Sequence, residues 1–263
     1  MDIRDRIIVV TGGGSGIGAA LCRRFAAEGA RAIVVADLDG EAAGAVAAEI
    51  GAGAHALDVS DEAQVVELIE RTEADLGPID LFCSNAGIGI GRGLEATNEQ
   101  WEKIMGVNVY AHVYAARALV PRMAARGGGY LLNTASAAGL LSQIGSVTYA
   151  VTKHAAVAFA EWVSITHGAE GIRVSVLCPQ AVNTPMIAAT EEGGVAGVDG
   201  VIEPEAVAGT VVEGLAAERF LILPHPVVAE YMQRKVGDYD RWLGGMRKLQ
   251  ARYGENAVAG LGD

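Results

Sequence analysis

The most regular feature of the sequence is an alternation between short apolar runs and longer segments with helical periodicity. The apolar runs are mainly aliphatic and show no regular alternation with polar residues, which is typical of strands buried on both faces of a parallel sheet. These runs predict about seven strands. They cover residues 7–10, 32–36, 54–57, 79–83, 130–134, 174–177 and 220–223.

The segments between these runs predict helices with recognisable start and stop signals. The segment 61–76 begins with the N-cap pattern Ser60-Asp61 and stops at Gly77-Pro78. The longest segment, 98–126, contains Pro121, which predicts a kink or a new turn there. Strands that alternate with helices predict right-handed crossovers and an α/β doubly wound Rossmann-type sheet. The predicted helices are 16–28, 61–76, 98–126, 146–167 and 205–217.

The chain shows no Pro- or Ser-rich linker and no internal repeat, so we expect a single domain over residues 1–263. Two segments interrupt the alternation. The glycine-containing stretch 185–201 is expected to be a substrate loop. The C-terminal extension, 224–263, predicts one more helix followed by a Gly-rich tail, which either covers the pocket or packs on a neighbouring subunit.

Composition and charge narrow the class of protein. Apolar residues make up 51% of the 263 residues and charged residues 20%, which is enough apolar material for a large core. The net charge of −12 is scattered along the chain and would repel a phosphate backbone, so nucleic acid is an unexpected partner. The N-terminus lacks a signal-peptide pattern, and no apolar run is long enough to span a membrane. We therefore expect a cytoplasmic protein without a membrane partner.

The cysteines and histidines do not predict a metal site. Cys22, Cys83 and Cys178 are widely separated and lie in apolar segments, so they are expected to be reduced core residues rather than a disulfide framework. The five histidines are dispersed, and none forms a close set with ligand spacing.

A glycine-rich string at 11–18 follows the first predicted strand and opens the first predicted helix. Glycines at such a turn allow the backbone to approach a pyrophosphate closely. The start of the helix adds unpaired N–H groups and the positive end of a dipole. This context predicts a dinucleotide site rather than an ordinary tight turn. The predicted contacts are Gly12, Ser15, Gly16, Ile17 and Gly18.

Asp37 follows the second predicted strand at the position where a dinucleotide site has an acidic residue. Its carboxylate can accept hydrogen bonds from both ribose hydroxyls and would repel a 2′-phosphate. Leu38 stands next to it, where a basic residue would be expected to hold NADP. NAD is therefore favoured over NADP. The alternative is that Asp37 only caps the following helix.

Tyr149 and Lys153 lie four residues apart on a predicted helix, so their side chains are expected on one helical face. A phenol has a pKa of about 10, which is too high for an efficient base near neutral pH. A neighbouring ammonium and an oxidised nicotinamide would both stabilise the phenolate. Such a pair can pass a proton to or from a substrate oxygen, although tyrosine and lysine at this spacing are commonly plain surface neighbours.

Taken together with Asn85-Ala86-Gly87, Asn108 and Ser136, these features resemble the short-chain dehydrogenase/reductase family in order and spacing. The resemblance extends to about residue 223. It implies that Tyr149 is the general acid/base and that Lys153 lowers the pKa of Tyr149 and binds the nicotinamide ribose. It also implies that Ser136 polarises the reacting oxygen and that Asn108 holds a water linking Lys153 to solvent.

The resemblance also implies cofactor contacts beyond the glycine string and Asp37. Asp58 and Val59 would contact the adenine. Val182 and Thr184 would contact the nicotinamide carboxamide, next to Pro179. The remaining implied cofactor contacts are Asn85, Ala86, Gly87, Tyr149 and Lys153.

Two positions depart from the family pattern. Ser84 precedes Asn85 where the family often has a second asparagine, and Gln180 follows Pro179 where the family usually has glycine. Gln180 would narrow the pocket or add a hydrogen-bonding group for a polar substituent. Apolar residues predict a hydrophobic pocket around it. These are Leu140, Leu141, Ile144, Met186 and Ile187, with Gln143 and Gln180 as orienting groups and further contacts from the loop around 88–93.

These features predict an oxidoreductase that transfers a hydride between NAD(H) and a hydrophobic secondary alcohol or ketone, with cyclic compounds among the candidates. One alternative is an NADPH-dependent 3-oxoacyl carrier-protein reductase, which Asp37 argues against. The other is a non-catalytic NAD-binding scaffold, which would require an eroded catalytic set. Members of the resembled family commonly form tetramers, so a homotetramer built on the helices at 98–126 and 146–167 is expected.

Overall fold

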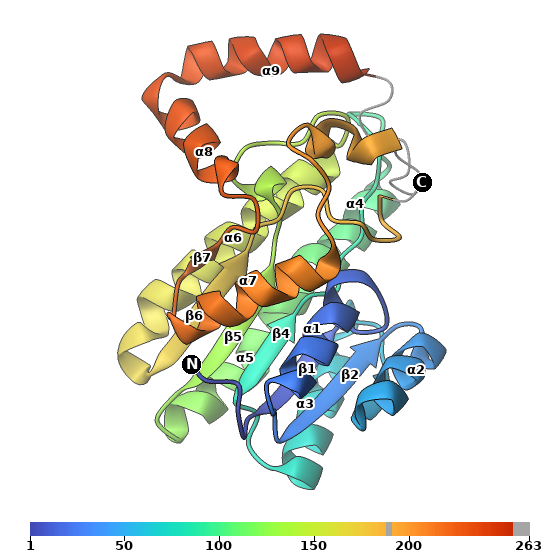
Figure 1. Ribbon diagram of the computed structural model, residues 1–263, viewed down its shortest axis with the longest axis vertical. Coiled ribbons are helices and arrows are strands. Elements are labelled where there is room, and N and C mark those ends of the chain that lie inside the picture. Colours follow the sequence, from blue (N-terminus) through green and yellow to red (C-terminus); the bar gives the residue numbers. More distant parts are fainter. Residues whose placement is uncertain (188–190, 255–263) are drawn as a thin grey trace.

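The strands form one seven-stranded parallel sheet with the order β3-β2-β1-β4-β5-β6-β7 (Figure 1). The computed structural model describes residues 1–187 and 191–254. The predicted Rossmann-type fold is confirmed. The strands are β1 (Ile7–Thr11), β2 (Ala32–Asp37), β3 (Gly53–Ala56), β4 (Leu81–Ser84), β5 (Gly129–Thr134), β6 (Ile172–Leu177) and β7 (Leu221–Ile222).

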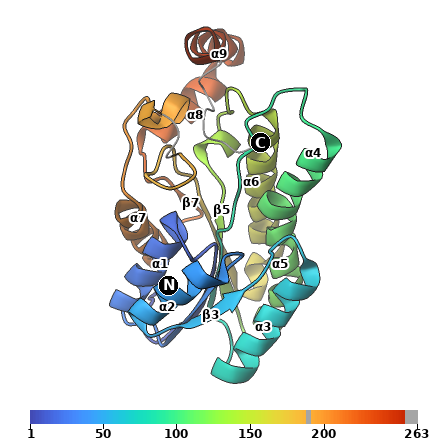
Figure 2. The same cartoon turned by 90° about the vertical axis from the view of Figure 1, so that its right-hand side faces the viewer.

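Helices cover both faces of the sheet (Figure 2). One face packs on α1, α2 and α7, and the other on α3, α5 and α6, and each interface forms its own hydrophobic cluster. The helices are α1 (Gly16–Ala27), α2 (Gly40–Ile50), α3 (Glu62–Leu76), α4 (Asn98–Met105), α5 (Ala111–Ala125), α6 (Val147–His167), α7 (Pro204–Ala216), α8 (Val227–Gly237) and α9 (Tyr239–Tyr253). Shorter helical turns are η1 (Gly106–Tyr110), η2 (Ala137–Gly139), η3 (Gly168–Glu170) and η4 (Glu191–Gly197).

The sheet reverses its strand order between β1 and β4. In doubly wound folds, ligands bind outside the carboxyl ends of the strands at such a switch point. The loops that follow β1, β4, β5 and β6 therefore point toward one edge of the molecule, where α8 and α9 also lie (Figure 1).

The prediction that all strands are buried on both faces is wrong for β3. Three of its four residues are exposed, because β3 is the edge strand and only β2 pairs with it. The pattern analysis also did not name α2 as a helix. That helix starts at Asp39, whose side chain accepts hydrogen bonds from the backbone N–H groups of Glu41 and Ala42.

The predicted helix at 98–126 is interrupted, but not at Pro121. Pro121 lies inside α5, and the break is the π-helical segment η1 between α4 and α5. Asn108 lies in this segment and is bonded in both directions to the backbone of Ile88. Single-turn π segments are commonly found at functional sites, where they aim one side chain out of the helical register.

The C-terminal extension contains two helices within residues 224–254, rather than the single predicted helix. Asp238 separates them in an extended conformation, and its side chain accepts a hydrogen bond from the backbone N–H of Arg241 to begin α9. The predicted Gly-rich tail from 255 onward lies outside the described residues, as do 188–190 of the predicted substrate loop. Within the described ranges, no helix is long and apolar enough to cross a membrane.

Candidate active site

A cavity of about 1080 Å³ opens at the carboxyl edge of the sheet. Every predicted site residue except Asn108 lines it, so positions from six strand ends and loops meet in one place. Asn108 lies directly behind the wall, fully buried. The predicted residues in the lining are Gly12, Ser15, Gly16, Ile17, Gly18, Asp37, Asp58, Val59, Asn85, Ala86, Gly87, Ser136, Tyr149, Lys153, Pro179, Val182 and Thr184.

The glycine-rich turn is shaped by close backbone contacts. Gly12 has a φ of 65°, and a Cβ there would lie 2.8 Å from the Cα of Ala86. A Cβ on Gly18 would lie 2.0 Å from the carbonyl oxygen of Gly12. Asn85 ties the turn to the next loop by donating to the carbonyl of Thr11 at 3.1 Å. A side chain at Gly12 or Gly18 would overlap backbone atoms, so glycine is required for this tight turn at the start of α1, where a diphosphate could bind.

Asp37 lies at the end of β2 and contacts the glycine-rich turn. Its carboxylate accepts hydrogen bonds from the backbone N–H of Gly14 at 2.9 Å and of Asp39 at 3.1 Å. The cap of α2 is Asp39, so Asp37 does not cap that helix. The Asp37 carboxylate lines the cavity and keeps free lone pairs for hydroxyl donors.

Asp58 and Val59 follow β3 at the same end of the cavity. The Asp58 carboxylate accepts hydrogen bonds from the backbone N–H and the hydroxyl of Ser60, and the Asp58 backbone N–H donates to Gln64. These local bonds fix the loop that would face an adenine ring.

Lys153 is nearly inaccessible, with 3% of its surface exposed, and its Nζ donates to the carbonyl of Thr134 at 3.1 Å. A Cβ on Gly87 would lie 3.3 Å from this Nζ and 3.4 Å from Oδ1 of Asn108. Gly87 therefore leaves open the space where the lysine and the asparagine approach each other. Burial lowers the pKa of Lys153 to about 8.

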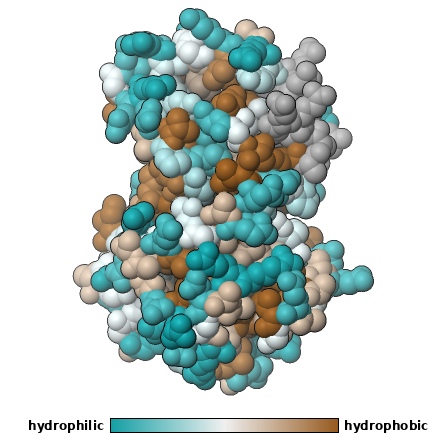
Figure 3. All heavy atoms as spheres, in the orientation of Figure 1, coloured by the Kyte–Doolittle hydropathy of each residue, from teal (hydrophilic) through white to brown (hydrophobic). Residues whose placement is uncertain are grey.

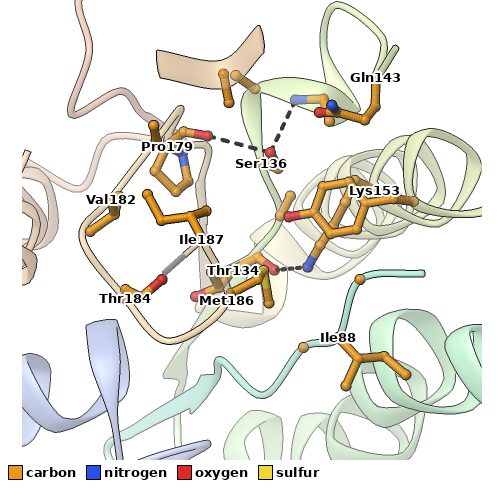
Figure 4. A pocket seen from close by; sticks show the side chains of 18 of the residues that line it. Ile88, Thr134, Ser136, Gln143, Lys153, Pro179, Val182, Thr184, Met186 and Ile187 are labelled. Atoms are coloured by element: carbon orange, nitrogen blue, oxygen red, sulfur yellow. Dashed lines mark hydrogen bonds between the residues drawn. The ribbon is translucent and has the colours of Figure 1, made fainter. Parts of the chain in front are cut away.

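Tyr149 and Ser136 face the same part of the cavity. The Ser136 hydroxyl accepts a hydrogen bond from the Ala138 backbone N–H at 3.1 Å and lies 3.4 Å from the carbonyl of Pro179 (Figure 4). Burial raises the pKa of the Tyr149 hydroxyl, and its hydrogen bond with Ser136 opposes that rise. The Nζ of Lys153 lies 5.6 Å from the centre of the Tyr149 ring. In the protein alone, burial therefore has the largest effect on the pKa of Tyr149.

The substrate end of the cavity is mostly apolar. Leu141, Ile144, Met186 and Ile187 line it as expected, and Gln143 and Gln180 do as well. The prediction for Leu140 is wrong, since it packs against the hydrophobic cluster beneath α5 and α6. Three residues of the predicted loop around 88–93 line the cavity: Ile88, Gly89 and Ile90.

Four further lining residues fall within the predicted substrate loop at 185–201, although the sequence analysis did not name them: Val195, Ala196, Val198 and Asp199. Sequence reasoning missed three residues of α9 that also line this end: Leu249, Arg252 and Tyr253. The sequence analysis expected the C-terminal extension either to cover the pocket or to pack on a neighbouring subunit. Three of its residues line the cavity in this structure: Tyr231, Trp242 and Met246. Residues 242, 246, 249 and 253 recur at helical spacing. This pattern in the sequence could have indicated that one face of a helix lines the pocket.

His112 is a further buried group that the sequence analysis set aside as dispersed. It lies one helical turn after Asn108 and is 1% exposed, and among the described atoms neither ring nitrogen has a hydrogen-bond partner. Burial and the nearby charge of Lys153 lower its pKa to about 3, so the ring is neutral at physiological pH. Within the described residues, no group of three or more His, Cys, Asp or Glu side chains is placed to hold a metal ion.

The fold and the cavity define a Rossmann-type oxidoreductase that uses a nicotinamide dinucleotide. The short chain dehydrogenase model matches residues 6–194, and the chain belongs to this family, whose members act on CH–OH groups.

Two relatives by sequence and one by structure are, by their names, also dehydrogenases. The chain is 42% identical over 231 residues to 1-deoxy-11-beta-hydroxypentalenate dehydrogenase of Streptomyces exfoliatus. The matched region covers 84% of each protein. It is 35% identical over 190 residues to meso-2,3-butanediol dehydrogenase of Serratia marcescens, covering 71% of this chain and 75% of the relative. A short-chain dehydrogenase/reductase from Burkholderia phymatum, solved in complex with NAD, superposes with a TM-score of 0.82 at 29% identity, covering 91% and 96% of the two chains.

Proposed function

We propose that this protein is an NAD-dependent dehydrogenase or reductase for hydrophobic secondary alcohols and ketones, with Tyr149 as its general acid/base. The observation that carries this proposal is one continuous cavity with Asp37 at one end and Tyr149, Ser136 and an apolar pocket at the other. A panel of cyclic and acyclic secondary alcohols, followed by NADH formation, tests it. Absence of NADH formation with every alcohol and of NADH consumption with every matching ketone would refute it.

The proposed choice of NAD rests on the charge of Asp37. In the Burkholderia phymatum relative the bound dinucleotide is NAD. The residues of this chain fit such a cofactor, because Gly12 and Gly18 line the cavity in a turn too tight for a side chain, at the start of α1. When bound, the nicotinamide ring would accept or donate the hydride. Asn85, Ala86 and Gly87 would line the cleft, Asp58 and Val59 would face the adenine, and Pro179, Val182 and Thr184 would lie beside the carboxamide.

The proposed mechanism assigns proton transfer to the protein. In alcohol oxidation, the Tyr149 phenolate takes the hydroxyl proton while the Ser136 hydroxyl holds the reacting oxygen. In ketone reduction, Tyr149 donates that proton. Lys153 supplies a positive charge beside the phenol, and together with the charge of an oxidised nicotinamide it would offset the effect of burial on the Tyr149 pKa. Asn108 fixes the backbone of Ile88 behind Lys153 and is proposed to hold the water that links Lys153 to solvent.

Asp37→Asn is expected to weaken NADH binding about tenfold and to strengthen NADPH binding about tenfold, because it removes one charge from the ribose end. Fluorescence titration with each reduced cofactor measures both effects. Asp39→Asn is the matched control, since it removes the same charge two residues away at a position outside the cavity lining. Equal changes in the two variants would contradict a specific role for Asp37.

The rate of alcohol oxidation and the rate of ketone reduction should change with pH in opposite directions. Burial raises the pKa of Tyr149, so phenolate is scarce near neutrality and becomes more abundant as pH rises. Initial rates of oxidation should therefore increase with pH, by up to about tenfold per unit below the pKa, whereas reduction should fall at alkaline pH. Steady-state rates between about pH 6 and pH 10 measure this. An oxidation rate that is flat across that range would argue against a tyrosine base with a raised pKa.

The proposed substrate is a bulky, mostly apolar, cyclic alcohol. The apolar side chains of Leu141, Ile144, Met186 and Ile187 support this proposal. Two of the relatives act, by their names, on a hydroxypentalenate and on butanediol, both of which carry hydroxyl groups.

We also propose that the chain is one domain that assembles as a homotetramer in the cytoplasm. Three apolar residues on one side of α6 are between 46% and 83% exposed: Val151, Trp162 and Ile165. Tyr110, which directly precedes α5, is exposed as well. Such an apolar face supports pairing with a second copy. The three buried free cysteines are compatible with a reducing compartment. Light scattering after gel filtration tests the tetramer, and a monomeric mass would contradict it.

A further inference from the structure

Helix α8 is joined to both walls of the substrate cavity by side-chain hydrogen bonds of Tyr231 and Lys235, and α9 follows it in the chain. We refer to residues 227–253 as the C-terminal bracket. It lies at the end of the molecule toward which the carboxyl ends of the strands point (Figure 1). Hydrophobic side chains gather at the narrow waist between this end and the body (Figure 3). None of the residues of α9, all of which are described, is buried, so the position of α9 depends on α8, which precedes it.

The base of the bracket is fixed at the sheet. The backbone N–H of Gln180, just after β6, donates to Nδ1 of His225 at 3.2 Å. His225 is 5% exposed, and Val228 in the first turn of α8 is fully buried. The bracket therefore starts from a rigid position beside Pro179 and Gln180.

One wall of the cavity is tied to α8 through Asp199. The hydroxyl of Tyr231 donates to Oδ1 of Asp199 at 2.9 Å, and Nε2 of Gln180 donates to Oδ2 of the same carboxylate at 3.1 Å. Asp199 follows η4 and lines the cavity. The side chain of Gln180, where the family pattern has glycine, thus joins the end of β6 to the wall formed by the segment around Asp199.

The opposite wall is tied to the same helix through Lys235. Its Nζ donates to the carbonyl oxygens of Leu140 at 2.8 Å and Leu141 at 3.0 Å. These carbonyls directly follow η2, the turn that begins at Ser136. Because Tyr231 and Lys235 are four residues apart, they lie on the same face of α8. One helical face therefore reaches both walls of the cavity.

The bracket also supplies the outer end of the cavity. Trp242, Met246, Leu249 and Tyr253 recur at helical spacing along α9, and all four line the cavity. A small alcohol needs only the space beside Ser136 and Tyr149, whereas a bulky apolar alcohol would extend to these side chains.

We infer that Tyr231 and Lys235 are specificity-determining residues that hold the bracket over the pocket and thereby select bulky apolar substrates. This inference rests on the proposed function and adds a substrate-size rule to it. The residues act by positioning the cavity walls and α9, without contact with the reacting atoms.

The test compares Tyr231→Phe, Lys235→Met and the double variant with wild type, using 2-propanol and the bicyclic alcohol 2-decalol. We expect KM for 2-decalol to rise about tenfold in the double variant, with kcat for 2-decalol nearly unchanged, because each lost hydrogen bond has a modest net effect. The kinetics with 2-propanol and the affinity for NADH should stay as in wild type. Lys248→Met is the matched control, because Lys248 is exposed on α9 and does not line the cavity.

Hydrogen exchange provides a readout that is independent of turnover. Residues 137–144 and α9 should exchange faster in the Tyr231 and Lys235 variants than in Lys248→Met. Unchanged exchange, or a loss of activity that is equal for both alcohols, would overturn the inference. If wild type oxidises neither alcohol, the proposed function is in question, and exchange in these segments still decides whether the bracket is held by these two residues.

Discussion

Tyr149→Phe is expected to lower kcat/KM for alcohol oxidation by about 10³-fold while leaving NADH affinity nearly unchanged. The substitution removes only the hydroxyl that exchanges the proton. The ring stays in place between Ser136 and Lys153, so the cavity keeps its shape. Steady-state kinetics with the best alcohol from the panel, together with an NADH fluorescence titration, measure the two quantities.

Tyr130→Phe is the matched control for this prediction. Tyr130 is also a buried tyrosine, and its hydroxyl lies 2.8 Å from the Ser175 hydroxyl, away from the cavity. Its loss should lower the free energy of unfolding by about 1 kcal/mol and leave catalysis intact. If Tyr149→Phe retained more than about a tenth of wild-type activity, proton transfer by this residue would be ruled out as a main source of catalysis.

Gly18→Ala is expected to weaken NADH binding by more than about 100-fold and to lower the free energy of unfolding by about 1–3 kcal/mol. The new Cβ would lie 2.0 Å from the carbonyl oxygen of Gly12 and 2.7 Å from Nδ2 of Asn85. Since the first of these is a backbone atom, the glycine-rich turn must shift to relieve the overlap. That shift displaces the N–H groups at the start of α1 that would bind the diphosphate.

Gly44→Ala separates this effect from the general consequence of adding a methyl group. Gly44 lies inside α2, and a Cβ there would meet no atom within 4 Å. The control should raise the free energy of unfolding by about 0.5–1 kcal/mol, because alanine favours the helix. Fluorescence titration and urea unfolding give both measurements. Wild-type NADH affinity in Gly18→Ala would show that the turn does not form the cofactor cradle.

Local sequence patterns were sufficient for the strands of the sheet interior and for the glycine-rich turn. Strand β1 is buried along its whole length and is almost entirely aliphatic, so its sequence pattern is sufficient to predict a strand buried on both faces. The turn at 11–18 needs glycine for steric reasons that depend only on the neighbouring strand and helix. The relation of Tyr149 to Lys153 follows from one helical turn, although the assignment of roles came from the family resemblance.

The same patterns failed where an element depends on what lies beside it. β3 was expected to be buried but is exposed, because nothing in its own sequence states that it is the last strand of the sheet. Pro121 is tolerated inside α5, whereas the real interruption at η1 accompanies the contact of Asn108 with Ile88, twenty residues away. Contacts over such separations are not encoded in a local period.

The sequence by itself determined the doubly wound fold, the dinucleotide turn and the spacing of the Tyr149–Lys153 pair, because each depends on neighbours a few residues away. Only the tertiary structure decided which side chains line the substrate end of the cavity and which ones tie its walls to α8. Asp199, Tyr231 and Lys235 come from segments that meet only after the sheet and its crossovers have formed. Their hydrogen bonds depend on where folding brings the chain, and the residue types alone do not specify that path.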